Sequence, residues 1–223
     1  MGTLFIVATP IGNLKDITLR ALETLKDADY ILCEDTRVTG RLLSNYQIEK
    51  KMVSFTDFNE ETKTKAVISD LISGLNIALL SDAGTPLVSD PGYKLVREAI
   101  KQEINVESMP GASAILSALT VSGMPPDKFL FIGYPPKKDG KKKELFEKIK
   151  KNNENVKITT ILYESPFRMI RTLKTLEEVF GNINICICRE LTKIHEEVKR
   201  GKVEDLIRYF ENKGTKGEFA VLF

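Results

Sequence analysis

Hydrophobic and polar positions alternate along the first half of the chain in a pattern typical of buried strands joined by amphipathic helices. Near-continuous apolar runs predict strands covered on both faces at 4–9, 30–33, 52–55, 76–80 and 104–109. Apolar residues at helical spacing between them predict helices, including 60–73, which Gly74 ends, and 112–122. We place a helix N-cap at Thr36 and Pro91 at the first position of another helix. This alternation predicts an α/β fold with a mostly parallel sheet.

The pattern changes after 123–126, a Gly-Met-Pro-Pro segment that we interpret as a linker. Beyond it, strands are relatively more frequent. We expect them at 128–133, 157–163, 183–190, 196–199 and 218–223, and helices at 143–151, 166–180 and 203–210. We therefore predict two domains, an N-terminal α/β domain over 1–122 and a C-terminal mixed-sheet α/β domain over 127–223.

Composition narrows the class of protein. Of the 223 residues, 42% are hydrophobic and 29% charged, which are ordinary globular values that exclude general disorder. No apolar run approaches the ~20 residues of a membrane span, and the short first run lacks the basic start of a signal peptide. The net charge of +2 gives no global argument for nucleic acid. The three cysteines lie in apolar runs, which favours buried thiols and the cytoplasm.

The loops that follow the N-terminal strands are rich in small and polar residues. They are 9–13, 34–37, 82–86 and 110–114. Because ligands of open α/β sheets bind outside the carboxyl ends of the strands, we expect a binding site there, although any single loop can be only a turn and a helix cap. The glycine patterns of dinucleotide-binding and P-loop proteins are missing from the sequence. No Cys/His cluster has the spacing of metal ligands, so we expect no metal.

Several blocks of sequence resemble the S-adenosylmethionine (SAM)-dependent tetrapyrrole (corrin/porphyrin) methylase superfamily and, within it, the branch that methylates ribose in small-subunit ribosomal RNA. The blocks that carry the resemblance are 4–14 with 16–18, 34–37, 81–86 with 89–92, 110–114, 163–168 and 189–197. They run in order over nearly the whole chain, and 4–14 and 189–197 are the most specific to the RNA branch. Members usually carry a further C-terminal segment.

The resemblance implies a two-domain tetrapyrrole-methylase-like fold, a homodimer without a membrane segment, and SAM bound in the cleft between the domains. It implies 2′-O-methylation of a cytidine ribose in the decoding centre of 16S rRNA, with the 30S subunit as partner. Carried over by position, the cofactor-binding residues are Pro10, Asp82, Ala83, Gly84, Thr85, Pro86, Leu87, Val88, Ser113, Ala114, Tyr163, Glu164, Phe219 and Ala220.

Carboxylates are the best candidates for the group that assists the ribose hydroxyl, because the single histidine, His195, more often has a structural or surface role. Asp35 and Glu190 each lie at the end of a predicted strand, and Arg37 and Lys193 are candidate clamps for phosphate or ribose oxygens. We therefore assign these four residues to catalysis. For 34–36 a helix-capping role is about equally plausible.

A lysine-rich segment is the candidate RNA surface. Residues 134–157 contain nine lysines and four acidic residues. They form either a phosphate-binding flap or an ordinary solvated face. The candidate base-stacking side chains near the proposed loops are Phe55, Phe58 and Tyr134.

Two other functions stay open on the sequence alone. One is SAM-dependent methylation of a tetrapyrrole precursor, which needs a basic pocket for a polycarboxylate inside the cleft. The other is a non-catalytic RNA-binding or ribosome-assembly factor that keeps the fold. The blocks at 34–37 and 189–197 favour the RNA methyltransferase.

Overall fold

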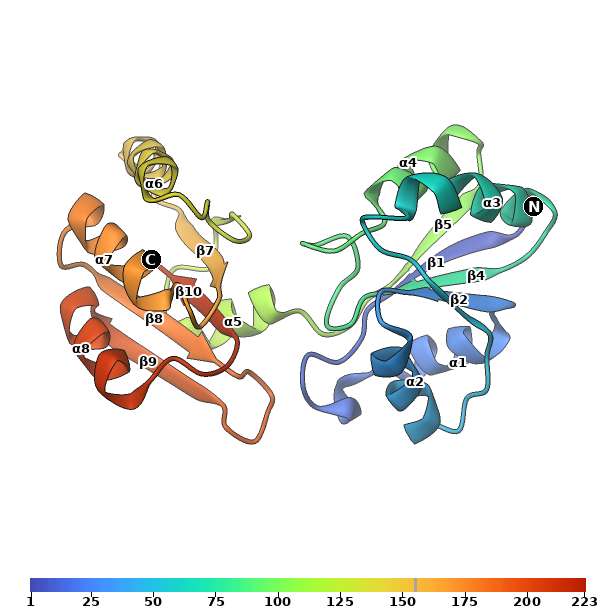
Figure 1. The fold of residues 1–223 in the computed structure, drawn as a ribbon, viewed down its shortest axis with the longest axis horizontal. Helices are drawn as coiled ribbons and strands as arrows, with labels where there is room; N and C mark the ends of the chain where they lie inside the picture. The colour runs from blue at the N-terminus through green and yellow to red at the C-terminus, as the bar shows by residue number, and fades with distance from the viewer. Residues whose placement is uncertain (155) are drawn as a thin grey trace. The chain divides into compact units, whose positions relative to one another are not determined.

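The computed structural model describes residues 1–154 and 156–223 (Figure 1). The chain divides into two compact units, Met1–Ser113 (unit 1) and Ala114–Phe223 (unit 2). Within the described residues, none of the helices combines the length and the apolar character that crossing a bilayer requires.

Unit 1 is built on a five-stranded sheet in the order β3-β2-β4-β1-β5, and all its strand pairs are parallel. The strands are β1 (Thr3–Val7), β2 (Tyr30–Cys33), β3 (Met52–Ser54), β4 (Ile77–Leu80) and β5 (Asn105–Met109). The helices are α1 (Leu19–Asp27), α2 (Thr36–Asn45), α3 (Glu60–Ile72) and α4 (Tyr93–Lys101), with a 3₁₀ turn at Leu14–Asp16. This confirms the predicted parallel sheet.

Both faces of this sheet are covered, as the continuous apolar runs indicated. Ile31 and Ala78 face one core with α1 and α2, whereas their neighbours Leu32 and Ile77 face the other core with α3 and α4 (Figure 1). Successive residues of one strand point to opposite faces, so a strand between two helical layers has to be apolar throughout.

Two predicted helix starts are wrong. Asp35, rather than Thr36, is the N-cap of α2, and its carboxylate accepts a hydrogen bond from the Arg37 amide at 2.8 Å. Pro91 is not helical, because Gly92 has φ +127°, a conformation that interrupts the helix and makes Gly92 the N-cap of α4. The end of α3 at Gly74, which has φ +103°, is confirmed.

Unit 2 contains a mixed sheet in the order β6-β7-β10-β8-β9, in which only the β6–β7 pair is parallel. The strands are β6 (Phe129–Phe131), β7 (Thr159–Glu164), β8 (Asn184–Arg189), β9 (Glu197–Lys202) and β10 (Phe219–Leu222). The helices are α5 (Ala114–Ser122), α6 (Asp139–Asn153), α7 (Met169–Phe180) and α8 (Val203–Lys213). The mixed sheet confirms the second half of the predicted fold class.

The helices of unit 2 lie in two layers. Helices α6, α7 and α8 pack on one face of the sheet around Phe146, Leu173 and Phe210. Helix α5 packs on the other face with Cys186 and Cys188, which are buried and free, with their sulfurs 3.9 Å apart. This confirms that the two cysteines are small core side chains.

Candidate functional site

The loops after β1, β4 and β5 meet at the carboxyl edge of the unit 1 sheet. Thr9 and Gly84 form a two-way backbone bridge, with N···O distances of 2.8 and 3.1 Å. The Ser81 hydroxyl donates to the Gly84 carbonyl at 3.0 Å, and the Thr85 hydroxyl donates to the Ala112 carbonyl at 3.3 Å. These contacts bring three of the predicted cofactor segments together, namely Pro10, 82–88 and the chain at Ser113.

The backbone of this loop is held in unusual conformations. Gly84 and Gly92 have φ of +85° and +127°, and between them two residues with side chains, Leu87 and Ser89, have φ of +71° and +69°. A left-handed conformation costs a non-glycine residue about 1–3 kcal/mol and persists only where the surroundings enforce it, most often at functional sites. A Cβ on Gly84 would also lie 3.3 Å from the Ile11 side chain, so the backbone passes close to the loop after β1.

Three acidic side chains gather at the same edge. The Asp82 carboxylate accepts a hydrogen bond from the Asp35 amide at 3.0 Å, which ties the loop after β4 to the loop after β2. Burial and nearby negative charge raise the pKa of Glu34 and of Asp82. Burial, followed by the charges of Glu34 and Asp82, raises the pKa of Asp90 to about 6. Crowded, partly buried carboxylates stabilise a cation placed among them.

Asp35 and Arg37 form a close pair at the start of α2. The Arg37 guanidinium donates from Nε and Nη2 to the Asp35 carboxylate, with an Nη2···Oδ2 distance of 2.6 Å. These hydrogen bonds, together with that from the Arg37 amide, lower the pKa of Asp35 to about 2. The Arg37 side chain is 84% exposed, so its remaining N–H groups face solvent. The predicted helix-capping role of this segment is therefore real and belongs to Asp35.

In unit 2, the predicted cofactor residue Glu164 is buried at the end of β7. One carboxylate oxygen accepts hydrogen bonds from the Ser165 amide and Arg168 Nε, and the other accepts the Thr172 hydroxyl at 2.5 Å. The carboxylate therefore organises the turn between β7 and α7. Its neighbour Tyr163 packs its ring against Phe131, with the centroids 4.8 Å apart.

Phe219 and Ala220 lie within β10, which is paired on both sides. Phe219 is opposite Glu164 on β7 and Arg189 on β8, and both Phe219 and Ala220 are buried. The Arg189 guanidinium lies over the Phe219 ring, 5.8 Å from its centroid. The side chains of Phe219 and Ala220 therefore belong to the core, and their backbone groups pair with β7 and β8.

Glu190 and Lys193 lie together in a tight loop after β8. Glu190 Oε1 accepts hydrogen bonds from the Glu218 amide at 2.9 Å and from Lys193 Nζ at 3.0 Å, and Lys193 also pairs with the Glu218 carboxylate. Burial acts to raise the pKa of Glu190, but these hydrogen bonds outweigh it and lower the pKa. Glu190 and Thr192 have φ of +52° and +66°. Glu190 therefore holds this loop against the chain at 217–218.

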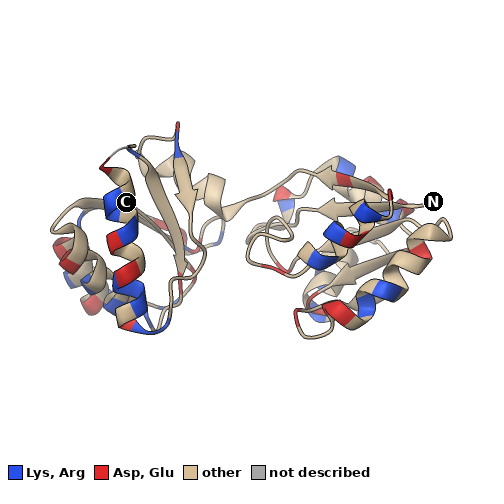
Figure 2. Ribbon diagram, turned by 90° about the horizontal axis from the view of Figure 1, so that it is seen from above, with Lys and Arg blue, Asp and Glu red and all other residues tan. Residues whose placement is uncertain are grey.

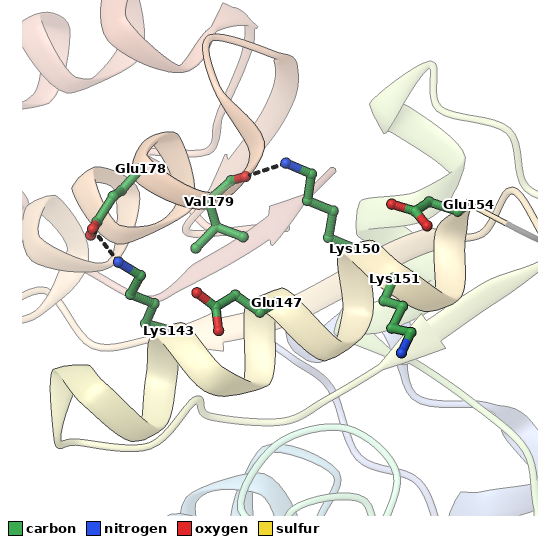
Figure 3. A pocket seen from close by; sticks show the side chains of 7 residues that line it. All are labelled: Lys143, Glu147, Lys150, Lys151, Glu154, Glu178 and Val179. Carbon is green, nitrogen blue, oxygen red and sulfur yellow. Dashed lines mark hydrogen bonds and ion pairs between the residues drawn. The ribbon is translucent and has the colours of Figure 1, made fainter.

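The lysine-rich segment is mostly the helix α6, and many of its lysines have partners. Lys143 pairs with Glu178 at 2.5 Å, and Lys150 donates to the Val179 carbonyl at 2.7 Å (Figure 3). These residues line an open depression of about 500 Å³ between α6 and α7, from which Lys151 points away (Figure 3). Basic and acidic residues are interspersed in both units (Figure 2). Helix α6 itself carries Asp139, Glu144 and Glu147 among its lysines, so the segment is not uniformly positive.

The aromatic candidates differ sharply in exposure. Phe55 is fully buried in the unit 1 core, so its proposed stacking role is wrong: it directly follows β3 and completes that strand's apolar run. Phe58 is fully exposed and Tyr134 is more than half exposed. Among the described residues, no group of three or more His, Cys, Asp or Glu side chains is arranged to hold a metal ion.

Sequence reasoning assigns no site role to two acidic residues of the strand-end loops. It predicts Asp90 only as part of a helix start, and it leaves Glu34, in the candidate loop 34–37, open between helix capping and a functional role. The signal for Glu34 is its place directly after β2, at the carboxyl edge of the sheet. Asp90 lies ten residues after β4, and only the folded loop brings it near Glu34 and Asp82.

Comparison with known proteins gives one consistent family. Residues 3–207 match the family model of tetrapyrrole (corrin/porphyrin) methylases. Two relatives are named ribosomal RNA small subunit methyltransferase I. The protein of Halalkalibacterium halodurans is 48% identical over 99% of this chain and 75% of its own length. That of Thermotoga maritima is 45% identical over 100% of this chain and 98% of its own length.

The crystal structure of a diphthine synthase has the same fold, with a TM-score of 0.75 at 16% identity over 100% of this chain and 90% of that one. The chain therefore belongs to the tetrapyrrole (corrin/porphyrin) methylase family.

Proposed function

We propose that this protein is a SAM-dependent methyltransferase that methylates the ribose 2′-oxygen of a cytidine in 16S rRNA of the small ribosomal subunit. The rRNA substrate rests on the relatives named ribosomal RNA small subunit methyltransferase I, which match the chain over nearly its whole length. The observation that carries the proposal is the joined set of strand-end loops in unit 1, where small residues and crowded carboxylates meet.

The residues at this edge fit SAM. When bound, SAM supplies a methyl group on a positively charged sulfonium. Negative charge at this edge comes from three carboxylates whose pKa values are raised, namely Asp82, Asp90 and Glu34. A cation bound nearby would stabilise their ionised forms and so lower these pKa values. Gly84, whose position has little room for a Cβ, lets the backbone approach a ligand closely. An adenine needs an apolar surface and a few backbone hydrogen bonds, and the loop 82–88 and Ser113 are our candidates for these.

Methyl transfer to a hydroxyl depends mainly on alignment. Holding the two reacting groups in line at near-attack distance supplies much of the rate. Asp35 is ionised at neutral pH because its pKa is about 2, so it accepts the hydrogen bond of a ribose hydroxyl more readily than it takes the proton. The pKa of Glu190 is also lowered, and the same argument applies to it. We propose for each of these carboxylates a role in orienting a substrate hydroxyl rather than in removing its proton.

Basic side chains at the surface of the two units are our candidates for contacts to RNA. Arg37 is held by Asp35 with free N–H groups that suit a phosphate, and Lys193 is our second candidate clamp. On α6, Lys141 and Lys151 have no ion-pair partner among the described residues, unlike Lys143 and Lys148. We expect these unpaired lysines to track the RNA backbone. We further propose a homodimer.

The test is to incubate the protein with methyl-tritiated SAM and three acceptors separately: 30S subunits lacking the modification, free 16S rRNA and uroporphyrinogen III. Label is expected in 30S subunits, at one cytidine. Methylation of the 2′-oxygen blocks alkaline cleavage of the adjoining phosphodiester, so the labelled product should be an alkali-stable dinucleotide containing cytidine. Label on the base, or on the tetrapyrrole alone, would overturn the proposal. Absence of SAM binding by calorimetry would favour a non-catalytic RNA-binding factor.

A further inference from the structure

Helix α4 begins at a position where no side chain can act as its cap. The first N–H groups of a helix lack intrahelical partners, and a Ser, Thr, Asp or Asn at the N-cap normally accepts one of them. Here the N-cap is Gly92, with φ +127°, and a Cβ on it would lie 2.6 Å from the Leu79 side chain. Both the backbone conformation and the packing on β4 exclude the usual capping residues.

A carboxylate from another helix takes this role. Glu60, in the first turn of α3, directs its Oε1 to the Gly92 amide at 3.1 Å and to the Lys94 amide at 2.9 Å. Glu60 is only 5% exposed, although it is charged and lies at a helix terminus. A negative charge at the N-terminus of α4 is favoured by the helix dipole and by the two charge-assisted hydrogen bonds.

Glu60 is itself held in place. Its amide donates to the Thr56 carbonyl at 2.8 Å, and the Thr64 hydroxyl donates to its carbonyl at 2.7 Å. The side chain of the preceding residue, Asn59, accepts the Thr56 amide at 2.9 Å rather than capping α3. The loop after β3 is therefore a rigid support from which Glu60 reaches the loop after β4.

The segment between Gly84 and Gly92 is fastened at both ends. The bridge to Thr9 fixes its entry, and Glu60 fixes its exit. Between these points Leu87 and Ser89 have left-handed conformations, which persist only where the surroundings enforce them. We propose that Glu60 is a positioning residue for the SAM-binding loop: by capping α4 from α3 it holds 84–92 in its binding conformation. This inference rests on the proposed function.

The experiment compares Glu60→Ala, Glu60→Gln and a control, Glu61→Ala. Glu61 is the adjacent residue, with an 85% exposed side chain, and it pairs with the Lys94 side chain instead of the Lys94 amide. We expect E60A to weaken SAM binding, measured by calorimetry at 15 °C, about tenfold, because only the fraction of molecules with the loop in place binds. In E60Q the amide oxygen accepts the same two hydrogen bonds, so the Kd should stay within about threefold of wild type. E61A should bind as wild type does.

Two further readouts separate positioning from a general loss of stability. With 30S subunits, E60A should raise the KM for SAM while kcat at saturating SAM stays within about threefold, since bound SAM restores the loop. Hydrogen exchange without ligand should accelerate at 84–94 in E60A and not in the amides of β4. If E60A does not fold, Glu60→Asp takes its place, because its shorter side chain cannot reach both amides.

The inference is overturned if folded E60A or E60D binds SAM with the wild-type Kd, if E60Q loses as much affinity as E60A, or if exchange at 84–94 is unchanged. Failure of the wild-type protein to bind SAM would count against the proposed function instead. In that case hydrogen exchange of the ligand-free variants still decides whether Glu60 positions the loop.

Discussion

Asp90 gives a prediction of pH-dependent stability whose sign follows from its surroundings. The side chain is partly buried in the loop after β4, where it faces the negative charges of Glu34, Asp82 and Asp57. Burial and these charges raise its pKa from 3.8 to about 6. The folded protein therefore holds a proton on Asp90 at pH values where the unfolded chain has released it.

The effect of Asp90 on the unfolding free energy develops over a defined pH range. Because the folded-state pKa is raised, the ionised carboxylate destabilises the fold, and this loss develops as pH rises from about 4 to above 6. At 1.36 kcal/mol per pKa unit, the loss reaches at most about 3 kcal/mol near pH 8, and solvent around this partly exposed side chain reduces it. Asparagine has nearly the same shape as aspartate and carries no charge. Asp90→Asn should therefore stabilise the protein by up to about 3 kcal/mol at pH 8 and by almost nothing at pH 4.

The assay is urea unfolding followed by circular dichroism at pH 4, 5, 6, 7 and 8 for wild type and D90N. Asp16→Asn is the control, because it changes the net charge equally at an exposed position of the same unit. Only D90N should show a difference that grows through the window from pH 4 to above 6. A stability difference that does not vary with pH, or a D90N protein less stable than wild type at pH 8, would refute the reasoning.

Three more predictions concern other parts of the molecule. Phe58→Ala should change the unfolding free energy by less than about 0.5 kcal/mol but weaken binding of single-stranded rRNA oligonucleotides in filter assays. Phe55→Ala should lower the unfolding free energy by about 3–5 kcal/mol. Equal losses of stability in the two variants would contradict the assigned exposures. Glu164→Ala should lower the unfolding free energy by about 3 kcal/mol in urea titrations, since it leaves Arg168 without its buried partner; a near-neutral change would show that the pair adds little. Calorimetry from pH 7.5 to 5 should show SAM losing more affinity than its neutral-sulfur product, because protonation of Asp90 removes negative charge near the sulfonium; parallel losses would place the sulfonium elsewhere.

The sheet of unit 1 could be predicted because its determinants are local. A strand between two helical layers has to be apolar at every position, and 30–33 and 77–80 satisfy this condition. The polar loops could be assigned to one edge because parallel strands have their carboxyl ends together. The predicted helix start at Pro91 is wrong because Gly92 has φ +127° and packs so closely on Leu79 that a Cβ would not fit, and neither feature can be predicted from the local sequence.

Contacts between side chains of different helices and strands could not be predicted from the sequence. The lysines of α6 look like a free basic face along the chain, yet Lys143 is neutralised by Glu178, which the fold brings from α7. Similarly, nothing local to Glu60 indicates that it caps a helix that begins more than thirty residues later. Contacts of this kind depend on the packing of two helices against one sheet, which periodicity predicts only in outline.

The acidic residues of unit 1 also show why residue type alone did not fix a catalytic role. Asp35 was a candidate base from its position, but Arg37 lowers its pKa to about 2, which suits orientation of a hydroxyl better than removal of its proton. Asp90, which sequence left unassigned, has a pKa of about 6 and destabilises the fold when ionised. A protein that keeps such a group beside Glu34 and Asp82 loses stability at the edge of the sheet where we propose that SAM binds. A bound cation recovers that stability, which is the strongest electrostatic reason to place a sulfonium among these three carboxylates.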